Sequence, residues 1–267
     1  MKDDTKNKLL VGVIGIVLIV AIISAATSNK TTPKYIINDK QIFTDIYEKN
    51  KGEEGLQTES TKNAVIQPFV EYLQGFIDTH EISSIIDMGC GYGELMKAVQ
   101  FPKNTEYLGL DIVDGIIDYN KKNYARDNVE FATVNTLEDL AAYQGDLLIL
   151  KDVMQHWTTA QVIYTRDYII PNFRYAIIVN DIWVQGSAPI NSEINVGGSR
   201  PLDLEIVPFS MKLKHIGDYD SSSLQKKRVY LYVNDNGRDS RMEEASIDEI
   251  QTEEIPTEIP IAEKQEI

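Results

Sequence analysis

The spacing of apolar residues predicts an alternation of helices and strands through the middle of the chain. Residues 63–77 place apolar side chains three and four positions apart, which is the spacing of an amphipathic helix. Pro68 inside this segment predicts either a kink or a helix that begins there. Short apolar runs follow, and segments of helical pattern lie between them. These predicted strands are 83–89, 106–113, 129–134, 147–150 and 175–179.

This alternation predicts an α/β fold. Repeated strand–helix units are typical of a doubly wound, mostly parallel sheet. Two further apolar runs, 211–218 and 227–233, are separated by a turn and predict an antiparallel hairpin at the end of the chain's folded part. We therefore expect a seven-stranded sheet within residues 61–235.

A long apolar segment precedes this region. Residues 9–26 carry no charge, and Ser24 is their only polar side chain. At ~1.5 Å per residue the segment spans roughly 27 Å, close to the thickness of the hydrocarbon layer. We expect a single transmembrane helix. A cleaved signal peptide is the alternative, since the small residues around Ser24 would suit cleavage. Lysines on both sides of the segment leave its orientation open.

The sequence thus divides the chain into five parts. The last part combines ten acidic residues with three basic ones and has no aromatic residue, which predicts a disordered acidic tail. Within the stem that precedes the α/β domain, the apolar spacing of residues 41–47 predicts a short helix. The five parts are an N-terminal tail (1–8), the apolar span (9–26), a stem or lid (27–60), the α/β domain (61–235) and the acidic tail (236–267).

Composition narrows the possible partners. The 41 acidic and 26 basic residues give a net charge of -15, which argues against general binding of nucleic acid. Cys90 is the only cysteine, so no intrachain disulfide can form. The three histidines lie far apart in the sequence, and no Cys/His spacing typical of a zinc site is present. We expect no metal.

The residues that carry chemistry gather where the first predicted strand ends. Asp87 is followed by glycines at alternate positions, Gly89, Gly91 and Gly93. Glycines there allow unusual backbone angles and a close approach to a ligand, and open α/β sheets bind ligands at this end of their strands. A dinucleotide fingerprint would have its third glycine at position 94, where Glu94 stands. This argues against an NAD-dependent oxidoreductase, which stays an alternative.

The pattern D-x-G-x-G-x-G resembles the first motif of class I S-adenosylmethionine-dependent methyltransferases, and the resemblance covers about residues 63–233. It implies a Rossmann-like fold with S-adenosylmethionine as cofactor. By this resemblance Asp111 would bind the ribose, Ile112 would pack on the adenine, and Asn135 would lie near the adenine amino group. The full set implied to bind the cofactor is Asp87, Gly89, Cys90, Gly91, Gly93, Asp111, Ile112, Asn135 and Lys151.

The segment after the fourth predicted strand supplies the catalytic candidates. In the family this loop, here residues 151–156, lies beside the transferred methyl group. A methyltransferase mainly aligns its reactants, but a hydroxyl acceptor also needs a base, and His156 or Asp152 would serve. Segments 45–47, 151–156 and 198–204 resemble a group of methyltransferase domains from bacteria and large viruses.

These observations lead to one expected function. We expect a membrane-anchored methyltransferase whose catalytic domain faces the cytosol, where the methyl donor is supplied. The acceptor is unidentified, with a hydroxyl of a glycan or small molecule favoured. Arg200 and Asp203 are candidates for contact with the substrate, or for a structural salt bridge. A partner-binding scaffold without catalysis is the other alternative.

Overall fold

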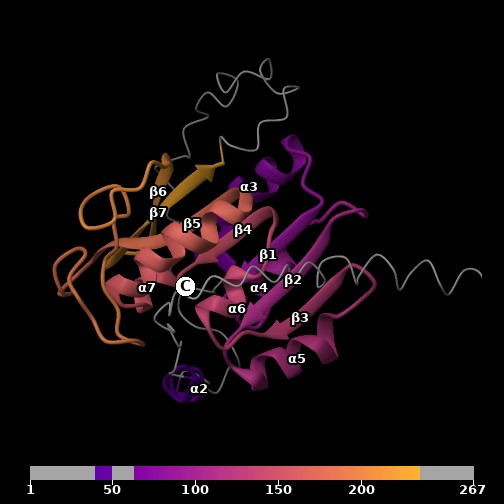
Figure 1. The fold of residues 1–267 in the computed structure, drawn as a ribbon, viewed down its shortest axis with the longest axis horizontal. Helices are drawn as coiled ribbons and strands as arrows, with labels where there is room; N and C mark the ends of the chain where they lie inside the picture. Colours follow the sequence, from indigo (N-terminus) through magenta and orange to yellow (C-terminus); the bar gives the residue numbers. More distant parts are fainter. Residues whose placement is uncertain (1–39, 50–62, 235–267) are drawn as a thin grey trace, which may run out of the picture.

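The computed structural model describes residues 40–49 and 63–234, which form a seven-stranded sheet with helices on both faces (Figure 1). The strand order is β3-β2-β1-β4-β5-β7-β6. Strands β1 to β5 run parallel to one another, whereas β7 runs antiparallel to both β5 and β6. The strands are β1 (Ser84–Met88), β2 (Glu106–Asp111), β3 (Val129–Thr133), β4 (Gly145–Lys151), β5 (Phe173–Val184), β6 (Lys214–Ser222) and β7 (Gln225–Val233).

The helices connect the parallel strands, and two of them begin with a capping box. The side chains of Thr136 and Thr158 each accept a hydrogen bond from the backbone three residues ahead, which satisfies an N–H that the first turn of a helix leaves free. The helices are α2 (Lys40–Lys49), α3 (Asn63–Thr79), α4 (Glu94–Ala98), α5 (Asp114–Tyr124), α6 (Leu137–Ala141) and α7 (Thr159–Tyr164). Shorter turns are η2 (Met154–His156), the π-helical η3 (Thr165–Ile169) and η4 (Ile170–Asn172).

The sheet separates two hydrophobic cores. Ile86 and Leu148 face the core that contains the side chains of α6 and α7. Their neighbours Ile85 and Leu147 face the other core, which α3 and α4 cover. Because successive side chains of a strand point to opposite faces, central strands buried on both sides need continuous apolar runs. The apolar runs seen in the sequence follow from this requirement.

The predicted fold class is confirmed. The sheet has seven strands, is mostly parallel and ends in an antiparallel hairpin. Helix α3 begins at Asn63 and contains Pro68, so the helix does not start at the proline. Strand β5 is longer than predicted and extends to Val184. The predicted short helix of the stem is present as α2.

The predictions for the two ends of the chain fall outside the described residues. These concern the tail (1–8), the apolar span (9–26), the acidic tail (236–267) and the stem (27–60) except α2. Within residues 40–49 and 63–234, no helix has both the length and the apolarity to cross a bilayer. The membrane span and the division into five parts stay predictions.

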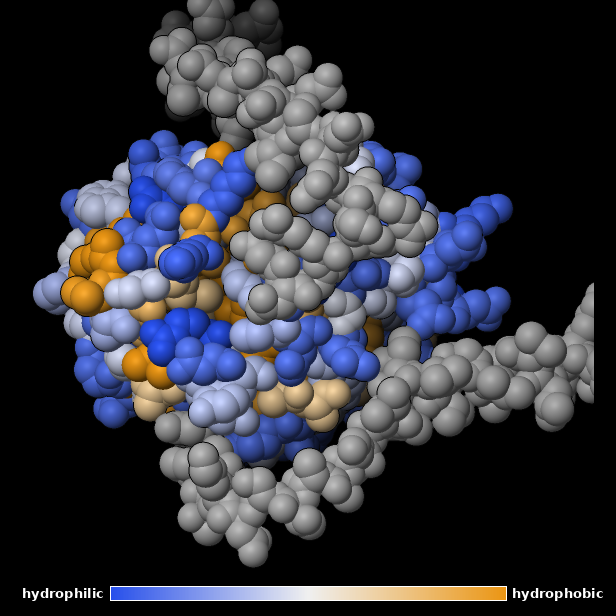
Figure 2. Space-filling model, turned by 45° about the horizontal axis from the view of Figure 1, so that its top comes forward, coloured by the Kyte–Doolittle hydropathy of each residue, from blue (hydrophilic) through white to orange (hydrophobic). Residues whose placement is uncertain are grey.

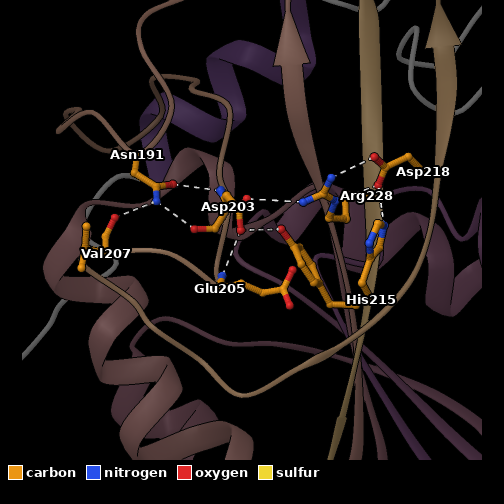
Figure 3. A network of polar contacts seen from close by, with 8 residues as sticks. Asn191, Asp203, Glu205, Val207, His215, Asp218 and Arg228 are labelled. Carbon is orange, nitrogen blue, oxygen red and sulfur yellow. Dashed lines mark hydrogen bonds and ion pairs between the residues drawn. The ribbon is translucent and has the colours of Figure 1, made fainter.

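A polar network fastens the long segment between β5 and β6 to the hairpin (Figure 3). Arg228 on β7 binds Asp218 through two hydrogen bonds of 2.7 and 3.0 Å. Its Nη1 also lies 3.4 Å from Oδ2 of Asp203, whose Oδ1 accepts a hydrogen bond from the Tyr230 hydroxyl at 3.1 Å. Asn191 exchanges two hydrogen bonds of 2.8 Å with the backbone of Asp203. The Asp203 carboxylate is therefore part of the scaffold.

Among the coloured residues of Figure 2, hydrophilic side chains predominate, with smaller apolar areas between them. Among the described residues, large exposed apolar side chains include Trp183, Val207 and Leu224. Most apolar residues of the strands are buried in the two cores.

Replacing Gly109 by alanine should destabilise the fold. A Cβ atom at Gly109 on β2 would lie 2.6 Å from Cδ1 of Phe131 and 3.1 Å from Sγ of Cys90. We expect a loss of about 1–3 kcal/mol in the free energy of unfolding, measured by urea denaturation. Gly115→Ala is the matched control, because a Cβ there meets no atom within 4 Å. Equal effects of the two substitutions would contradict the packing described.

Candidate functional site

A cavity of about 360 Å³ opens at the carboxyl ends of the central parallel strands. Strand β1 lies between β2 and β4, so the chain leaves β1 toward one side of the sheet and later returns on the other. Such a reversal point is where open α/β sheets bind ligands. We call the part lined by residues of β1 and β2 the glycine-loop end. The lysine end is the part lined by Lys151, Asp152, Asp181 and Lys227.

The loop after β1 adopts a conformation that requires glycine. Gly89, Gly91 and Gly93 have φ angles of 77°, 52° and 71°, in the left-handed region. A Cβ atom at Gly89 would lie 2.4 Å from Cγ2 of Val153, so the loop packs directly against the loop after β4. At Gly91, the closest atoms to such a Cβ are 3.6 Å away, on Glu94 and Tyr47. A Cβ at Gly91 would therefore make only ordinary van der Waals contacts, and it is the left-handed φ angle that favours glycine there.

Asp111 at the end of β2 ties this loop to the sheet. Its carboxylate accepts hydrogen bonds from the backbone N–H of Gly91 at 3.2 Å and of Val113 at 3.0 Å. Asp111 is buried, and burial raises its pKa to about 6 even though these hydrogen bonds oppose the shift. Ile112 follows it and adds an apolar wall to the cavity.

Two more buried carboxyl groups line the glycine-loop end. Asp87 accepts a hydrogen bond of 2.6 Å from the Tyr107 hydroxyl, and burial raises the pKa of Asp87 to about 6. Burial also raises the pKa of Glu94. With Asp111, three buried carboxyl groups thus line this end of the cavity. A cationic ligand bound beside them would favour their ionised forms and so lower all three pKa values.

The lysine end is built from alternating charges. The ammonium group of Lys227 donates to Oδ1 of Asp152 at 2.6 Å and to Oδ1 of Asp181 at 2.7 Å. Lys151 donates to the other oxygen of Asp152 at 2.5 Å. Gln155 completes the cluster, since its Nε2 donates to Oδ2 of Asp181 at 3.0 Å. Each carboxylate is thus held at both of its oxygens.

The two lysines determine the protonation of Asp152. Burial alone would raise its pKa, but the ammonium groups of Lys151 and Lys227 hold it well below its usual range. Asp152 also has a φ of 60°, a left-handed angle that few non-glycine residues adopt. A carboxylate with so low a pKa is a weak base. Asp152 is therefore better suited to positioning than to accepting a proton.

His156 is oriented by the segment between β5 and β6. Its Nδ1 lies 2.7 Å from the carbonyl oxygen of Gly198, and Gly197 donates its N–H to the carbonyl of His156 at 3.0 Å. A carbonyl only accepts hydrogen bonds, so Nδ1 carries the proton of this contact. In a neutral imidazole the lone pair then belongs to Nε2. His156 lines the cavity and can offer Nε2 as a base.

Helix α2 covers one side of the cavity. Its inward residues are Phe43, Ile46 and Tyr47. The ring of Tyr47 packs edge-on against Tyr92 with centroids 6.0 Å apart, and Lys40 forms an ion pair with Asp114 of α5. These contacts fix α2 beside the glycine-loop end.

The structure brings most of the predicted site residues into one cavity. Its lining includes Asp87, Gly89, Cys90, Gly91, Asp111, Ile112, Lys151, Asp152 and His156. Gly93 lies behind the loop, where a Cβ would be 3.2 Å from the Tyr124 ring. Asn135 is exposed and does not line the cavity, so its predicted contact with a cofactor gains no support from the structure.

Sequence reasoning missed Asp181 and Lys227. Both are almost fully buried and complete the lysine end. One indication for Lys227 was present in the sequence, because a charged side chain stands within the predicted strand 227–233. Nothing in the sequence paired it with Asp181. Within the described parts of the chain, no group of three or more His, Cys, Asp or Glu side chains is arranged to hold a metal ion.

Residues 86–166 match a family model described as a methyltransferase domain. This segment is therefore similar to methyltransferase domains. The matched segment runs from β1 through α7 and contains the glycine loop, Asp111 and the loop with Asp152 and His156. The resemblance to class I S-adenosylmethionine-dependent methyltransferases is confirmed.

Solved structures resemble this chain only distantly. The N-terminal domain of EvdMO1 with S-adenosylhomocysteine bound is 14% identical, with a TM-score of 0.47 over 62% of this chain and 80% of that one. Mitomycin 7-O-methyltransferase MmcR is 15% identical, with a TM-score of 0.47 over 65% and 54%. TehB from Haemophilus influenzae is 11% identical, with a TM-score of 0.45 over 65% and 66%. Among curated proteins, none matches this chain.

Acidification should stabilise the ligand-free protein through Asp111. Its pKa of about 6 in the folded protein exceeds the ordinary value of 3.8, so the folded state gains a proton before the unfolded chain does. The free energy of unfolding should therefore rise between pH 7 and pH 5, and Asp111→Asn should reduce this rise by about 1 kcal/mol. Urea denaturation at both pH values measures the effect.

Asp114→Asn is the control for this measurement. The pKa of Asp114 is lowered by its hydrogen bonds with Lys40 and Thr133, so its stabilising contribution is lost only as the pH falls below the ordinary value. In Asp114→Asn, the free energy of unfolding should therefore rise between pH 7 and pH 5 as much as it does in wild type. If Asp111→Asn keeps the full wild-type increase in the free energy of unfolding, Asp111 does not take up a proton between pH 7 and pH 5.

Proposed function

We propose that the domain binds S-adenosylmethionine and transfers a methyl group to a hydroxyl acceptor. One observation carries the proposal. The glycine loop and Asp111 line the same cavity, and the backbone N–H of Gly91 donates a hydrogen bond to the Asp111 carboxylate. The family match over residues 86–166 supports the same reaction class.

The residues present fit this cofactor. The left-handed φ angles of Gly89 and Gly91 hold the loop backbone in the cavity wall, and Asp111 carries carboxylate oxygens suited to a diol. Ile112 offers an apolar surface for a base, and Asp87 and Glu94 favour a ligand with positive charge. When bound, S-adenosylmethionine supplies a methyl group on a positively charged sulfur, already activated for transfer.

The lysine end suits the acceptor. A hydroxyl can donate to a carboxylate and accept from an ammonium group, and Asp152 with Lys151 and Lys227 presents both. His156 offers Nε2 to receive the hydroxyl proton, while Asp152 stays ionised and positions the acceptor. We therefore assign the role of base to His156.

The proposal extends to the place where the reaction occurs. The apolar run at residues 9–26 supports a single membrane anchor, and the need for a methyl donor supports a cytosolic catalytic domain. A glycan or small molecule with a hydroxyl is the favoured acceptor. Cleavage of the domain by protease added outside intact cells would contradict the cytosolic orientation.

Titration with S-adenosylhomocysteine and with NAD tests the cofactor. We expect calorimetry of the full chain to show binding of S-adenosylhomocysteine and none of NAD. Asp111→Ala should weaken binding by about tenfold or more, because the variant loses the ribose contact and the support of Gly91. Asp118→Ala is the control, since Asp118 is exposed on α5 and does not line the cavity. Binding of NAD alone would show an oxidoreductase, and binding of neither would favour a partner-binding scaffold.

Replacing His156 tests its role as the base independently of cofactor binding. His156→Gln should lower kcat by about 10²–10⁴-fold in a labelled-methyl assay with a panel of hydroxyl compounds. The affinity for S-adenosylhomocysteine should stay within about twofold of wild type. His215→Gln is the control, because His215 binds Asp218 on β6 outside the cavity. Full activity in His156→Gln would exclude His156 as the base.

A further inference from the structure

The charged side chains at the lysine end balance one another. Lys151 and Lys227 bring two positive charges to the cavity lining, and Asp152 and Asp181 bring two negative ones. Both oxygens of each carboxylate accept a hydrogen bond, and the ammonium group of Lys227 lies between the two carboxylates. The formal charge of this end of the cavity is therefore zero.

Neighbouring charged groups do not change this balance. Among the described residues, the cavity lining holds no lysine or arginine besides the two already named, and its remaining carboxyl groups belong to the glycine-loop end. Arg200 is fully buried and does not line the cavity. The negative charge of Glu193 favours the charged form of Arg200, so this cation has an acid near it.

Uncharged polar side chains complete the lysine end. Gln225 lines the cavity and lies two residues before Lys227 on β7, so both face the same side of the sheet. Ser199 lines it from the segment between β5 and β6, directly after Gly198, whose carbonyl oxygen contacts His156. The lysine end thus combines balanced charges with an amide and a hydroxyl.

These groups keep hydrogen-bonding capacity for a ligand. Ser199 is exposed, and its hydroxyl makes no hydrogen bond with the described residues. The Oε1 of Gln225 lies 3.5 Å from the Ser221 hydroxyl, while its Nε2 has no partner in the described part of the chain. Lys151 uses one of its three N–H donors on Asp152. Donors and acceptors from three segments therefore remain available.

A charged group on the acceptor would upset the balance of the lysine end. A carboxylate, phosphate or ammonium group that enters the cavity loses water, and only a free opposite charge compensates this loss. Both lysines are already paired with Asp152. A neutral hydroxyl loses less on leaving water, and it can donate to a carboxylate and accept from an ammonium group.

We propose that the lysine end selects an uncharged polyol, a compound with several neighbouring hydroxyl groups such as a neutral sugar, and disfavours acceptors charged near the reacting hydroxyl. One hydroxyl would lie beside His156, and its neighbours would bond to Ser199 and Gln225. That this polyol is the methyl acceptor rests on the proposed function.

Two series of compounds that differ in charge test the selection. One is methyl glucoside with a hydroxyl, a carboxylate or an ammonium group at carbon 6, and the other is glycerol, glycerate and 3-amino-1,2-propanediol. Saturation-transfer NMR measures their binding to the full chain saturated with S-adenosylhomocysteine at pH 7. We expect the neutral member of at least one series to bind with a Kd of about 10 mM or tighter, and its charged counterparts about tenfold more weakly.

Changing the charge of the lysine end should change the preference in a direction set by the sign. Asp181→Asn leaves one positive charge in excess, so the anionic member should gain about tenfold relative to the neutral one. Lys151→Met leaves one negative charge in excess and should favour the cationic member by a similar factor. Asp220→Asn and Lys122→Met are the matched controls, because both residues are exposed and lie outside the cavity lining.

Replacing the uncharged side chains should have a different effect. Ser199→Ala and Gln225→Leu should weaken binding of the neutral polyol by about threefold to tenfold and leave the charge preference unchanged. Ser187→Ala is the control, since Ser187 is exposed and does not line the cavity. Thermal unfolding of each variant identifies any that fails to fold, and Lys151→Met then tests the charge preference if Asp181→Asn is lost.

The outcomes separate this selection from the cofactor assignment. A wild-type chain that binds a charged member as tightly as the neutral one would overturn the selection, and so would a ranking that Lys151→Met leaves unchanged. Binding of S-adenosylhomocysteine with no binding of either series at about 50 mM would overturn the polyol class alone. Selective binding of a neutral polyol by a chain that does not bind S-adenosylhomocysteine would support the selection and overturn the proposed function.

Discussion

The ammonium group of Lys227 holds together the strands on which the lysine end depends. It bridges Asp152 after β4 and Asp181 on β5 from its own place on β7, and it is 1% exposed. Charges buried this deeply are stable only with each other, since removal of one leaves the others unpaired. The C-terminal hairpin is therefore not an accessory to the parallel sheet. Its second strand fixes where the loop after β4 lies.

The sequence was sufficient to predict the sheet and the glycine-loop end. Alternating apolar runs predict the order of strands and helices because central strands are buried on both faces, and Asp87 with its glycines marks the end of β1. Asp111 could be placed for the same reason, since it lies near the end of the next predicted strand, 106–113. These features depend on residues close to one another in the chain.

The lysine end could not be predicted because it depends on pairing between distant strands. Lys227 lies opposite Asp181 only because β7 inserts between β5 and β6, and the sequence predicts a hairpin without saying which of its strands joins the sheet. The same limit applies to Arg200 and Asp203. Of these two candidates, Asp203 is bound in the network with Arg228, whereas Arg200 has no ion-pair partner among the described residues.

The buried acids of the glycine-loop end bear on the pH dependence of binding. Asp87, Glu94 and Asp111 all have raised pKa values because burial disfavours their ionised forms. A positively charged ligand bound among them would favour those ionised forms. Its binding would therefore release protons to the solvent, and the affinity of the cavity for it would fall as the pH falls through about 6, the pKa of Asp87 and Asp111.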